Sequence, residues 1–469
     1  MLRKIRIAAA AFFFVLTTLL FLDFTGTLHA WFGWMAKIQF LPALLALNVG
    51  VVAFLVILTL LFGRVYCSVI CPLGVMQDIV SWASGKRRKH RNRFAYSPAL
   101  TWLRRGMLVV FVAAMLAGVG SLLAPYSAYG RIASNLLAPV YAWGNNLLAY
   151  IAGRMDSYAF YSVDVWMKSL STLLVAVVTF AVLFVLAWRS GRTYCNTICP
   201  VGTVLGFLAR YSLFKPRFDT SKCNGCKLCA RNCKASCIDP AAHKIDYSRC
   251  VACMDCLENC RQGAITYTLR RRKPDPAPAP QRPAADAAKT PSDASRRRFL
   301  GLAGIVAYSA LRAQEKKVDG GLAVIVDKKI PNRATPVVPP GAQSLRHFNA
   351  HCTGCQLCVS VCPNQVLRPS GKLMTLMQPE MSFERGYCRP ECTKCAEVCP
   401  TGAIRLTDLA GKSSIQIGHA VWIAENCEVN TDGVSCNNCA RHCPAGAIKM
   451  VRRDPDDPKS PRIPAVNEE

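Results

Sequence analysis

Twenty of the 25 cysteines in this 469-residue chain form five groups of four. In most groups three cysteines follow one another closely, and the fourth comes after three further residues. Three such thiolates can hold three irons of a cubane, and the fourth cysteine of tandem groups reaches the neighbouring cluster. Zinc sites usually pair two separated CxxC units, and disulfides need no third cysteine in the same turn. The spacing therefore predicts [4Fe–4S] clusters and electron transfer, with these ligands: Cys223, Cys226, Cys229, Cys233, Cys250, Cys253, Cys256, Cys260, Cys352, Cys355, Cys358, Cys362, Cys388, Cys392, Cys395, Cys399, Cys427, Cys436, Cys439 and Cys443.

The first two groups stand in tandem, so their fourth cysteines are expected to cross over. Crossed pairing predicts two ligand sets: Cys223, Cys226 and Cys229 with Cys260, and Cys250, Cys253 and Cys256 with Cys233. Cys237 belongs to no group and is interpreted as a buried neutral thiol, with a spare-ligand role as the alternative.

Four further cysteines form two CxxxCP pairs, Cys67/Cys71 and Cys195/Cys199. They lie in a repeated GRxYCxxICPxG segment at residues 63–74 and 191–202. Four soft thiol ligands suit a cofactor-binding metal or cluster centre, whereas two thiols per loop suit reversible disulfide chemistry. A turn that only ends each helix is the third interpretation, and the spacing leaves all three open.

The elements that position these cysteines are predicted to be membrane spans. The chain is 52% hydrophobic with a mean hydropathy of +0.22, and its apolar residues gather in the first 190 positions. Four apolar stretches approach the roughly 20 residues that cross a bilayer, at residues 7–22, 38–62, 107–123 and 170–188. Buried helices of a large soluble core are the alternative, but they seldom come four together with so few charges between them.

The net charge of +29 follows the predicted topology. Basic residues at positions 86–105 lie between the second and third stretches, and short basic loops beside spans mark the cytoplasmic side. Arg3, Lys4 and Arg6 likewise hold the N-terminus inside, which places the first two cysteine groups in the cytoplasm. The basic residues are not interleaved with aromatic residues as on a nucleic-acid surface, so we expect no nucleic-acid partner.

A proline- and alanine-rich linker at residues 271–294 separates the first two groups from the last three. Beyond it, Ser295-Arg-Arg-Arg-Phe-Leu300 and an apolar run to Leu311 are typical of a twin-arginine export signal. The flank of a short fifth span is the alternative. Both interpretations place the last three groups on the opposite, periplasmic face.

These motifs resemble two protein families, here fused. Residues 1–270 resemble NapH-type membrane ferredoxins, and residues 295–450 resemble NapG/MauM-type polyferredoxins. The resemblance implies an α-helical membrane domain with four to five spans plus two α+β bacterial-ferredoxin-like cluster domains. The expected domains are a transmembrane domain (1–214), a cytoplasmic dicluster domain (215–270), the linker (271–294), the signal or fifth span (295–313) and a periplasmic polyferredoxin domain (314–469), which is expected to lack a fourth motif at its C-terminus.

The resemblance also implies a function and a cluster arrangement. It implies an inner-membrane, quinol-linked electron conduit with two cytoplasmic and two to three periplasmic [4Fe–4S] clusters, a quinone, and an unidentified periplasmic redox partner. The sequence shows no set of catalytic residues that would make the chain a self-contained enzyme. The alternative is an assembly or regulatory factor of the NosR type. In NapG-type pairing, Cys443 would join the Cys388 group and Cys399 would join the Cys427 group, which leaves the Cys352 group without a fourth ligand unless Cys362 bends back.

Overall fold

The computed structural model describes residues 1–269 and 335–467, except for positions 24, 87–92, 118–121, 158, 384–385, 416, 418–420 and 444–445. The predicted linker and twin-arginine-like segment, with Arg296 and Arg297, lie outside the described residues. The described chain divides into two compact units, Met1–Lys412 and Ser413–Glu469.

Two described helices are long and apolar enough to cross a membrane, α1 (Leu2–Leu22) and α11 (Leu170–Ser190). They fall on the first and fourth predicted spans. In each, only 22% of the most apolar window is buried inside the protein, so most of the apolar surface faces outward. Helices α5 (Val49–Phe62) and α13 (Pro200–Ala209) are apolar but shorter.

The second predicted span is not one helix. It is divided into α4 (Phe40–Leu45) and α5 by a turn in which Leu47 has a φ of 53° and the Asn48 side chain accepts a hydrogen bond from the Val51 N–H. An asparagine N-cap starts a new helix instead of continuing the old one, which explains the break. The third predicted span corresponds to α8 (Thr101–Leu116), which has 16 residues. Helices α2 (Thr27–Phe32) and α3 (Trp34–Lys37) connect α1 to α4.

The two CxxxCP repeats adopt the same local structure. A short helix, α6 (Val65–Val69) or α12 (Thr193–Thr197), carries the first cysteine of each pair. The second cysteine is the N-cap of α7 (Pro72–Gly85) or α13, and each of these helices begins with proline. Proline suits that first position because its missing N–H would have no partner there. The repeat in sequence is therefore a repeat in structure.

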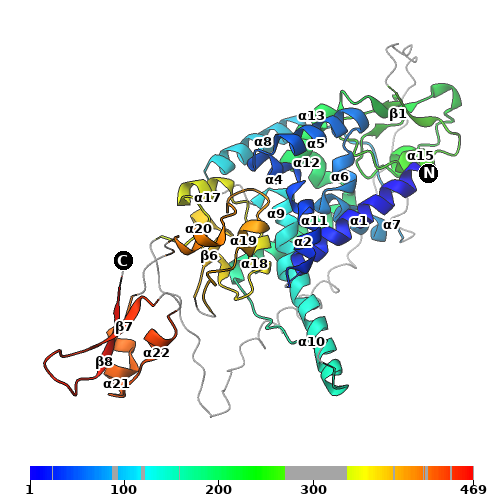
Figure 1. Ribbon diagram of the computed structural model, residues 1–469. Coiled ribbons are helices and arrows are strands. Elements are labelled where there is room, and N and C mark those ends of the chain that lie inside the picture. Colours follow the sequence, from blue (N-terminus) through cyan, green and yellow to red (C-terminus); the bar gives the residue numbers. More distant parts are fainter. Residues whose placement is uncertain are drawn as a thin grey trace, which may run out of the picture. The chain divides into compact units, whose positions relative to one another are not determined.

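The connection from α8 to α11 contains α9 (Pro125–Ile132), the π-helix η3 (Ala133–Leu137) and α10 (Ala138–Arg154). Every residue of α9 is buried, and α9 packs against α7 and α11. Helix α10 has no buried residue and extends from the rest of the unit (Figure 1).

The first cysteine domain (residues 214–269) is closed by an antiparallel pair, β1 (Phe214–Phe218) with β4 (Ile265–Leu269), in which Phe214 lies opposite Leu269. Its cysteine loops are interrupted by η4 (Thr220–Lys222), α14 (Leu228–Arg231), β2 (Ile238–Asp239), β3 (Lys244–Ile245) and α15 (Asp255–Asn259).

The second cysteine domain (residues 335–412) has a similar build. It contains α17 (Leu345–His351), α18 (Leu357–Ser360), β5 (Leu367–Pro369), η5 (Leu373–Thr375), β6 (Pro379–Met381), α19 (Lys394–Glu397) and the start of α20 (Leu409–Ser413). The C-terminal unit (Ser413–Glu469) contains η6 (Ala424–Asn426), α21 (Glu428–Thr431), α22 (Asn438–Arg441) and the hairpin of β7 (Ile448–Arg452) and β8 (Arg462–Val466).

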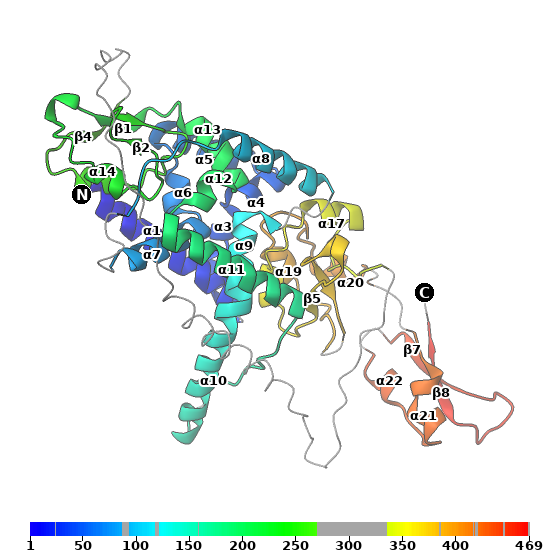
Figure 2. The ribbon, with the colours of Figure 1, turned by 180° about the vertical axis from the view of Figure 1, so that it is seen from behind.

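Helix α1 contacts a cysteine domain at each of its ends (Figures 1 and 2). Near its start, Arg3 Nε donates to Asp255 Oδ1 of α15 at 2.8 Å. At its far end α1 packs against α18, and just beyond it Lys394 Nζ donates to the Thr25 carbonyl at 3.2 Å. Twenty-one helical residues measure about 30 Å, which matches the hydrocarbon thickness of a bilayer. The two domains therefore lie at opposite ends of a helix of membrane-spanning length.

Candidate iron–sulfur and thiol sites

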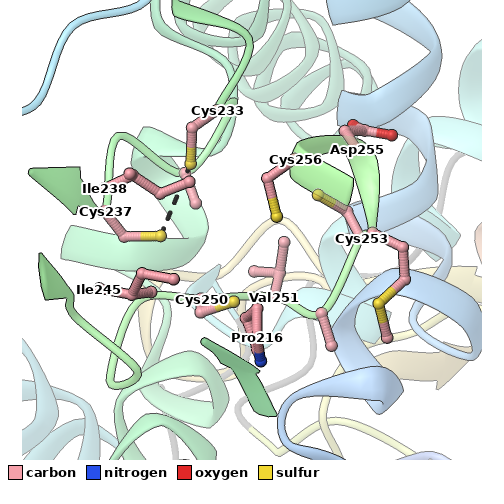
Figure 3. A pocket seen from close by; sticks show the side chains of 13 residues that line it. Pro216, Cys233, Cys237, Ile238, Ile245, Cys250, Val251, Cys253, Asp255 and Cys256 are labelled. Atoms are coloured by element: carbon pink, nitrogen blue, oxygen red, sulfur yellow. Dashed lines mark hydrogen bonds between the residues drawn. The ribbon is translucent and has the colours of Figure 1, made fainter. Parts of the chain in front are cut away.

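Four cysteines of the first domain line one pocket, called here the proximal pocket. They are the crossed set expected from the spacing: Cys233, Cys250, Cys253 and Cys256. Figure 3 shows their sulfur atoms around a common space, with Ile238, Ile245 and Val251 as apolar neighbours. Four thiols around an apolar pocket are the donor set and surroundings of an iron–sulfur cluster.

The other crossed set lines a second pocket, the distal pocket, of about 290 Å³. Its cysteines are Cys223, Cys226, Cys229 and Cys260. Cys226 is exposed, whereas Cys233 in the proximal pocket is 7% exposed. The domain thus offers two four-cysteine sites, one open toward its surface and one enclosed.

Cys237 lies in the proximal pocket as well. Its Sγ is 3.6 Å from that of Cys233, the contact drawn as a dashed line in Figure 3. Hydrogen bonds to Cys233 and Cys250, together with burial, raise the pKa of the Cys237 thiol well above its usual range. The same bond lowers the pKa of Cys233 to about 7. The Cys237 thiol is therefore buried beside two predicted ligands.

The two CxxxCP pairs come together inside the protein. All four cysteines are buried, each 5–6% exposed. The other three thiols each interact electrostatically with Cys199. Arg64 Nη2 lies 3.7 Å from Cys67 Sγ, and Gln77 Nε2 lies 3.3 Å from Cys195 Sγ. The four cysteines Cys67, Cys71, Cys195 and Cys199 are called here the four-thiol group. Polar donors lie close to the sulfur atoms of Cys67 and Cys195.

An exchange of arginines joins the repeats. Arg64 of the first repeat donates to the carbonyl of Cys195, and Arg192 of the second donates to the carbonyl of Cys67, at 3.2 and 2.6 Å. Both guanidinium groups are fully buried. Gly202 leaves room for the first contact, because a Cβ there would lie 2.2 Å from the Cys195 oxygen and 2.8 Å from Arg64 Nη2. Gly74 is crowded in the same way by Cys67 and Arg192.

The proximal pocket rests directly on the repeats. The Arg192 N–H donates to the Lys234 carbonyl at 2.8 Å, and Asn196 Nδ2 donates to the Ala235 carbonyl at 3.2 Å. Arg64 Nη1 donates to the Ser248 carbonyl, also at 3.2 Å. These three carbonyls belong to the chain that flanks Cys233 and Cys250, so the enclosed site of the first domain faces the four-thiol group.

A buried ion network fastens the same contact. Asp78 of α7 accepts from Arg192 at 2.8 Å, from Arg6 at 3.0 Å and from Lys234 at 3.2 Å. Lys234 also bonds to Asp255, at 2.9 Å. One carboxylate thus holds together α1, both repeats and the first cysteine domain.

On its other side the four-thiol group is linked to the second cysteine domain by α9. Arg131 of α9 interacts electrostatically with Tyr194 of the second repeat and with Cys355. The backbone of α9 lies close to the same cysteine, since a Cβ at Gly130 would lie 2.5 Å from the Cys355 carbonyl. Asn135 Nδ2 adds a 2.9 Å bond to Gln356.

The second cysteine domain pairs its cysteines differently from the NapG-type expectation. Burial and the neighbouring Cys399 raise the pKa of the Cys355 thiol to about 12. Cys399 also interacts with Cys352 and Cys358. Cys362 interacts with Cys388 and Cys395 of the other group. The third and fourth groups therefore exchange their fourth cysteines, and the expected lack of a fourth ligand for the Cys352 group is corrected.

The fifth group lies wholly in the C-terminal unit. That unit contains four cysteines, Cys427, Cys436, Cys439 and Cys443. With Cys399 placed beside the Cys352 group, the pairing of Cys399 with the Cys427 group is also corrected. The number of cysteines in the unit equals the number that one cubane requires.

Among the described residues, no three histidine, cysteine, aspartate or glutamate side chains converge as tightly as a single metal ion requires. The cysteine sets instead surround spaces, as the two pockets of the first domain do. Four thiols apiece are the donor set of an iron–sulfur cluster, and the proximal pocket adds apolar walls.

Several residues of these sites were not predicted from the sequence. Arg64, Arg192 and the paired glycines belong to the repeat that was recognised, so their identity in both copies was an available signal. Asp78 and Lys234 lie outside any repeat, and no local pattern indicates that they meet across 156 positions.

Two family models match parts of the chain. Residues 44–90 and 172–221, which contain both CxxxCP repeats, match a 4Fe-4S binding domain. Residues 351–403 match a 4Fe-4S dicluster domain. The second match covers the two groups that exchange their fourth cysteines in the structure.

The chain is also similar to ferredoxin-type proteins. It is 28% identical to the methylamine utilization protein MauN of Paracoccus denitrificans over 36% of this chain and 48% of that protein. Identity with NapH of Escherichia coli is 29%, over 41% of this chain and 55% of NapH. Identity with MauM of Methylophilus methylotrophus is 33%, over 24% of this chain and 50% of MauM. The chain thus spans about half the length of these relatives. No solved structure matches it.

These similarities support a ferredoxin-type iron–sulfur protein of the NapH and MauN kind. Another relative, 28% identical over 39% of the chain, is the putative electron transport protein YccM of Escherichia coli. Electron transfer by iron–sulfur clusters is therefore the activity that the relatives and the family models indicate together.

Proposed function

We propose that this chain is a multi-pass inner-membrane conduit that carries electrons between the quinone pool and a periplasmic oxidoreductase. Bound [4Fe–4S] clusters would supply one-electron redox centres at the cysteine sets of each domain. The protein would contribute the insulated path between them. The fusion of a NapH-type and a NapG/MauM-type part, and export of the second part by a twin-arginine signal, belong to this proposal.

The order of the sites within the first unit supports a conduit. The distal pocket opens to the surface, and the proximal pocket rests on the repeats through Arg192 and Arg64. The four-thiol group follows, and α9 lies between it and Cys355 of the second domain. Each site adjoins the next, so electrons could pass along the unit without a mobile carrier.

The observation that carries the proposal is the position of α1. One cysteine domain contacts its start and the other contacts its end, and the helix between them has membrane-spanning length. An electron-transfer protein confined to one face of a membrane would have no need of this arrangement.

The four-thiol group is proposed to act as a single cofactor-binding site. The 4Fe-4S binding domain model covers both repeats, which favours a metal centre over thiol–disulfide exchange. Arg64 and Arg192 would then serve to neutralise thiolate charge inside the protein.

The experiment compares cluster reduction in the purified full chain with that in Cys67→Ser and Cys195→Ser variants. A short-chain quinol should reduce the clusters of the unaltered protein. Each variant should lose much of that rate, and the double variant should lose little more, because both cysteines belong to one site. Full rates in both variants would leave the repeats a structural role only. Effects on the maturation of a partner alone would favour the assembly-factor alternative.

A further inference from the structure

A buried aspartate–histidine pair lies just beyond the end of α1. His29 Nδ1 is 3.1 Å from Asp23 Oδ2, and the two side chains are 6% and 3% exposed. A carboxylate only accepts hydrogen bonds, so Nδ1 carries a proton, and in the neutral imidazole the lone pair lies on Nε2. Nε2 is buried and has no hydrogen-bond partner among the described residues.

The local fold explains Asp23 but not this nitrogen. Asp23 accepts from the N–H groups of Gly26 and Leu28 at 2.9 Å and from the Thr25 hydroxyl at 2.7 Å, so it organises the turn into α2. Burial opposes ionisation, yet the bonds from His29, Thr25 and Gly26 outweigh it and hold the pKa of the Asp23 carboxyl well below its usual range. A structural cap would not require a histidine whose second nitrogen is buried without a partner.

The surroundings of the pair indicate what approaches it. Trp31 and Trp34 on α2 and α3 are 79% and 47% exposed, as expected of aromatic residues at a membrane interface. No residue of α2 is buried as a whole, so the pair is covered by a helix that itself lies at the surface. A membrane-soluble aromatic ligand could therefore reach it by a shift of this short helix.

The pair also adjoins the second cysteine domain. Lys394 Nζ donates to the carbonyl of Thr25, in the turn that Asp23 organises, at 3.2 Å. Lys394 lies between Cys392 and Cys395 in the fourth group. Besides Asp23, Lys394 is the charged side chain that lies against this turn among the described residues. A ligand at His29 would therefore lie next to a predicted cluster site.

We propose that Asp23 and His29 form the proton-accepting pair of a hydroquinone-oxidation site at this end of the membrane domain. The inference rests on the quinone link of the proposed function and locates it. A hydroxyl of the hydroquinone donates to Nε2, and Asp23 orients the ring and stabilises the imidazolium that forms.

The reaction balances with one hydroquinone and two oxidised [4Fe–4S] clusters. The first O–H bond breaks as an N–H bond forms on Nε2, and one electron leaves to an oxidised cluster. After His29 releases that proton to water, the second O–H proton follows the same route and the second electron leaves to a second oxidised cluster. The products are one quinone, two protons and two clusters reduced by one electron each.

The test uses the full chain with its clusters, purified in detergent, and decylubiquinol as the probe. His29→Gln keeps an N–H donor but cannot take up a proton. We expect it to slow reduction of the clusters by decylubiquinol at least about 10²-fold, while reduction by dithionite stays unchanged. Asp23→Asn should slow the quinol reaction as well, because it removes the carboxylate that orients the ring. His243→Gln, a half-buried histidine in a turn of the first cysteine domain, is the matched control and should behave as the unaltered protein.

Two further readouts separate a proton acceptor from a structural residue. Equilibrium binding of decylubiquinone should weaken in His29→Gln, and the rate of quinol oxidation in the unaltered protein should fall with acidification, whereas the residual rate of the variant should not. Equal quinol rates in His29→Gln and His243→Gln would overturn the site but leave the conduit intact. If dithionite but not decylubiquinol reduces the clusters of the unaltered protein, the quinone link of the proposed function fails instead.

Discussion

At the scale of single residues, the shared arginine and glycine positions of the two CxxxCP repeats are explained by the contacts that each arginine makes with the other repeat. Each arginine crosses to the other repeat and donates to the carbonyl of its first cysteine. Gly74 and Gly202 leave space for the arginines, and Pro72 and Pro200 begin the helices that carry the glycines. The arginine and glycine positions are therefore coupled, and a change at one should act through the other.

Gly202→Ala tests this coupling. The new Cβ would lie 2.2 Å from the Cys195 oxygen and 2.8 Å from Arg64 Nη2, so Arg64 would have to move. Such overpacking costs about 1–3 kcal/mol, and we expect a lower thermal unfolding midpoint in detergent. Gly106→Ala in α8 is the control, because its Cβ would meet nothing within 4 Å. Alanine there should not lower the midpoint, since it favours helix by about 1 kcal/mol. Equal midpoints for the two variants would contradict the coupling.

Which cysteines share a site was predictable from the sequence where the groups stand close together along the chain. The crossed set of Cys233 with the Cys250 group follows from tandem motifs, and the structure places these residues around one pocket. The sequence did not predict that Cys399 joins the Cys352 group. The family resemblance favoured the Cys427 group instead. The third and fourth groups are neighbours along the chain, as the first and second are, and this was the available signal.

At the scale of elements, local pattern was less reliable. Hydropathy predicted one span over residues 38–62, but the cap at Asn48 divides it, and a window average cannot register a single capping residue. Burial of α9 was not predictable either, because its tyrosines and small residues have no strong period and their partners lie on α7 and α11. Contacts between elements distant in sequence decide both features.

The ion network around Asp78 is the clearest contact of this kind. It joins α1, α7, the second repeat and the first cysteine domain through Arg6, Arg192 and Lys234. Because these charges are largely buried, removal of the carboxylate would take the anionic partner from Arg6 and Arg192.

Asp78→Asn should therefore destabilise the unit by about 3–5 kcal/mol. The expected result is a lower thermal unfolding midpoint and faster proteolysis of the first cysteine domain in the full chain. Asp219→Asn is the matched control, since Asp219 pairs with Lys222 on the surface at 3.3 Å and should be replaceable with little effect. Similar losses in the two variants would show that the network does not hold the domain in place.

At the scale of the whole molecule, the corrected pairing makes the C-terminal unit independent of the other ligand sets. The first unit contains both crossed pairs of the first domain and both of the second. A chain truncated after Lys412 should thus keep the four clusters of its two cysteine domains, or about 16 irons in those sites. Iron analysis and visible absorbance of the purified protein would measure this. If Cys443 were a ligand of the Cys388 group, the truncated chain would lose iron from the second domain as well.

The two-sided arrangement is the last and most general prediction. If α1 crosses the membrane, the cysteine domains at its two ends lie in different compartments. An epitope can be inserted in the turn at Ala241, in the first domain, and another in the exposed turn at Lys459, in the C-terminal unit. In intact spheroplasts, protease should remove the second epitope and spare the first until the cells are lysed.

The same assay tests the route of export. Replacement of Arg296 and Arg297 by lysine should protect the Lys459 epitope from protease, because the twin-arginine machinery would no longer accept the segment. The Ala241 epitope should be unaffected, since the N-terminal helices insert before that segment is reached. If the Lys459 epitope is already protected in the unaltered protein, the second half of the chain stays inside. All five cysteine groups would then lie on one face of the membrane, and α1 would be a helix that lies between two domains without separating two compartments.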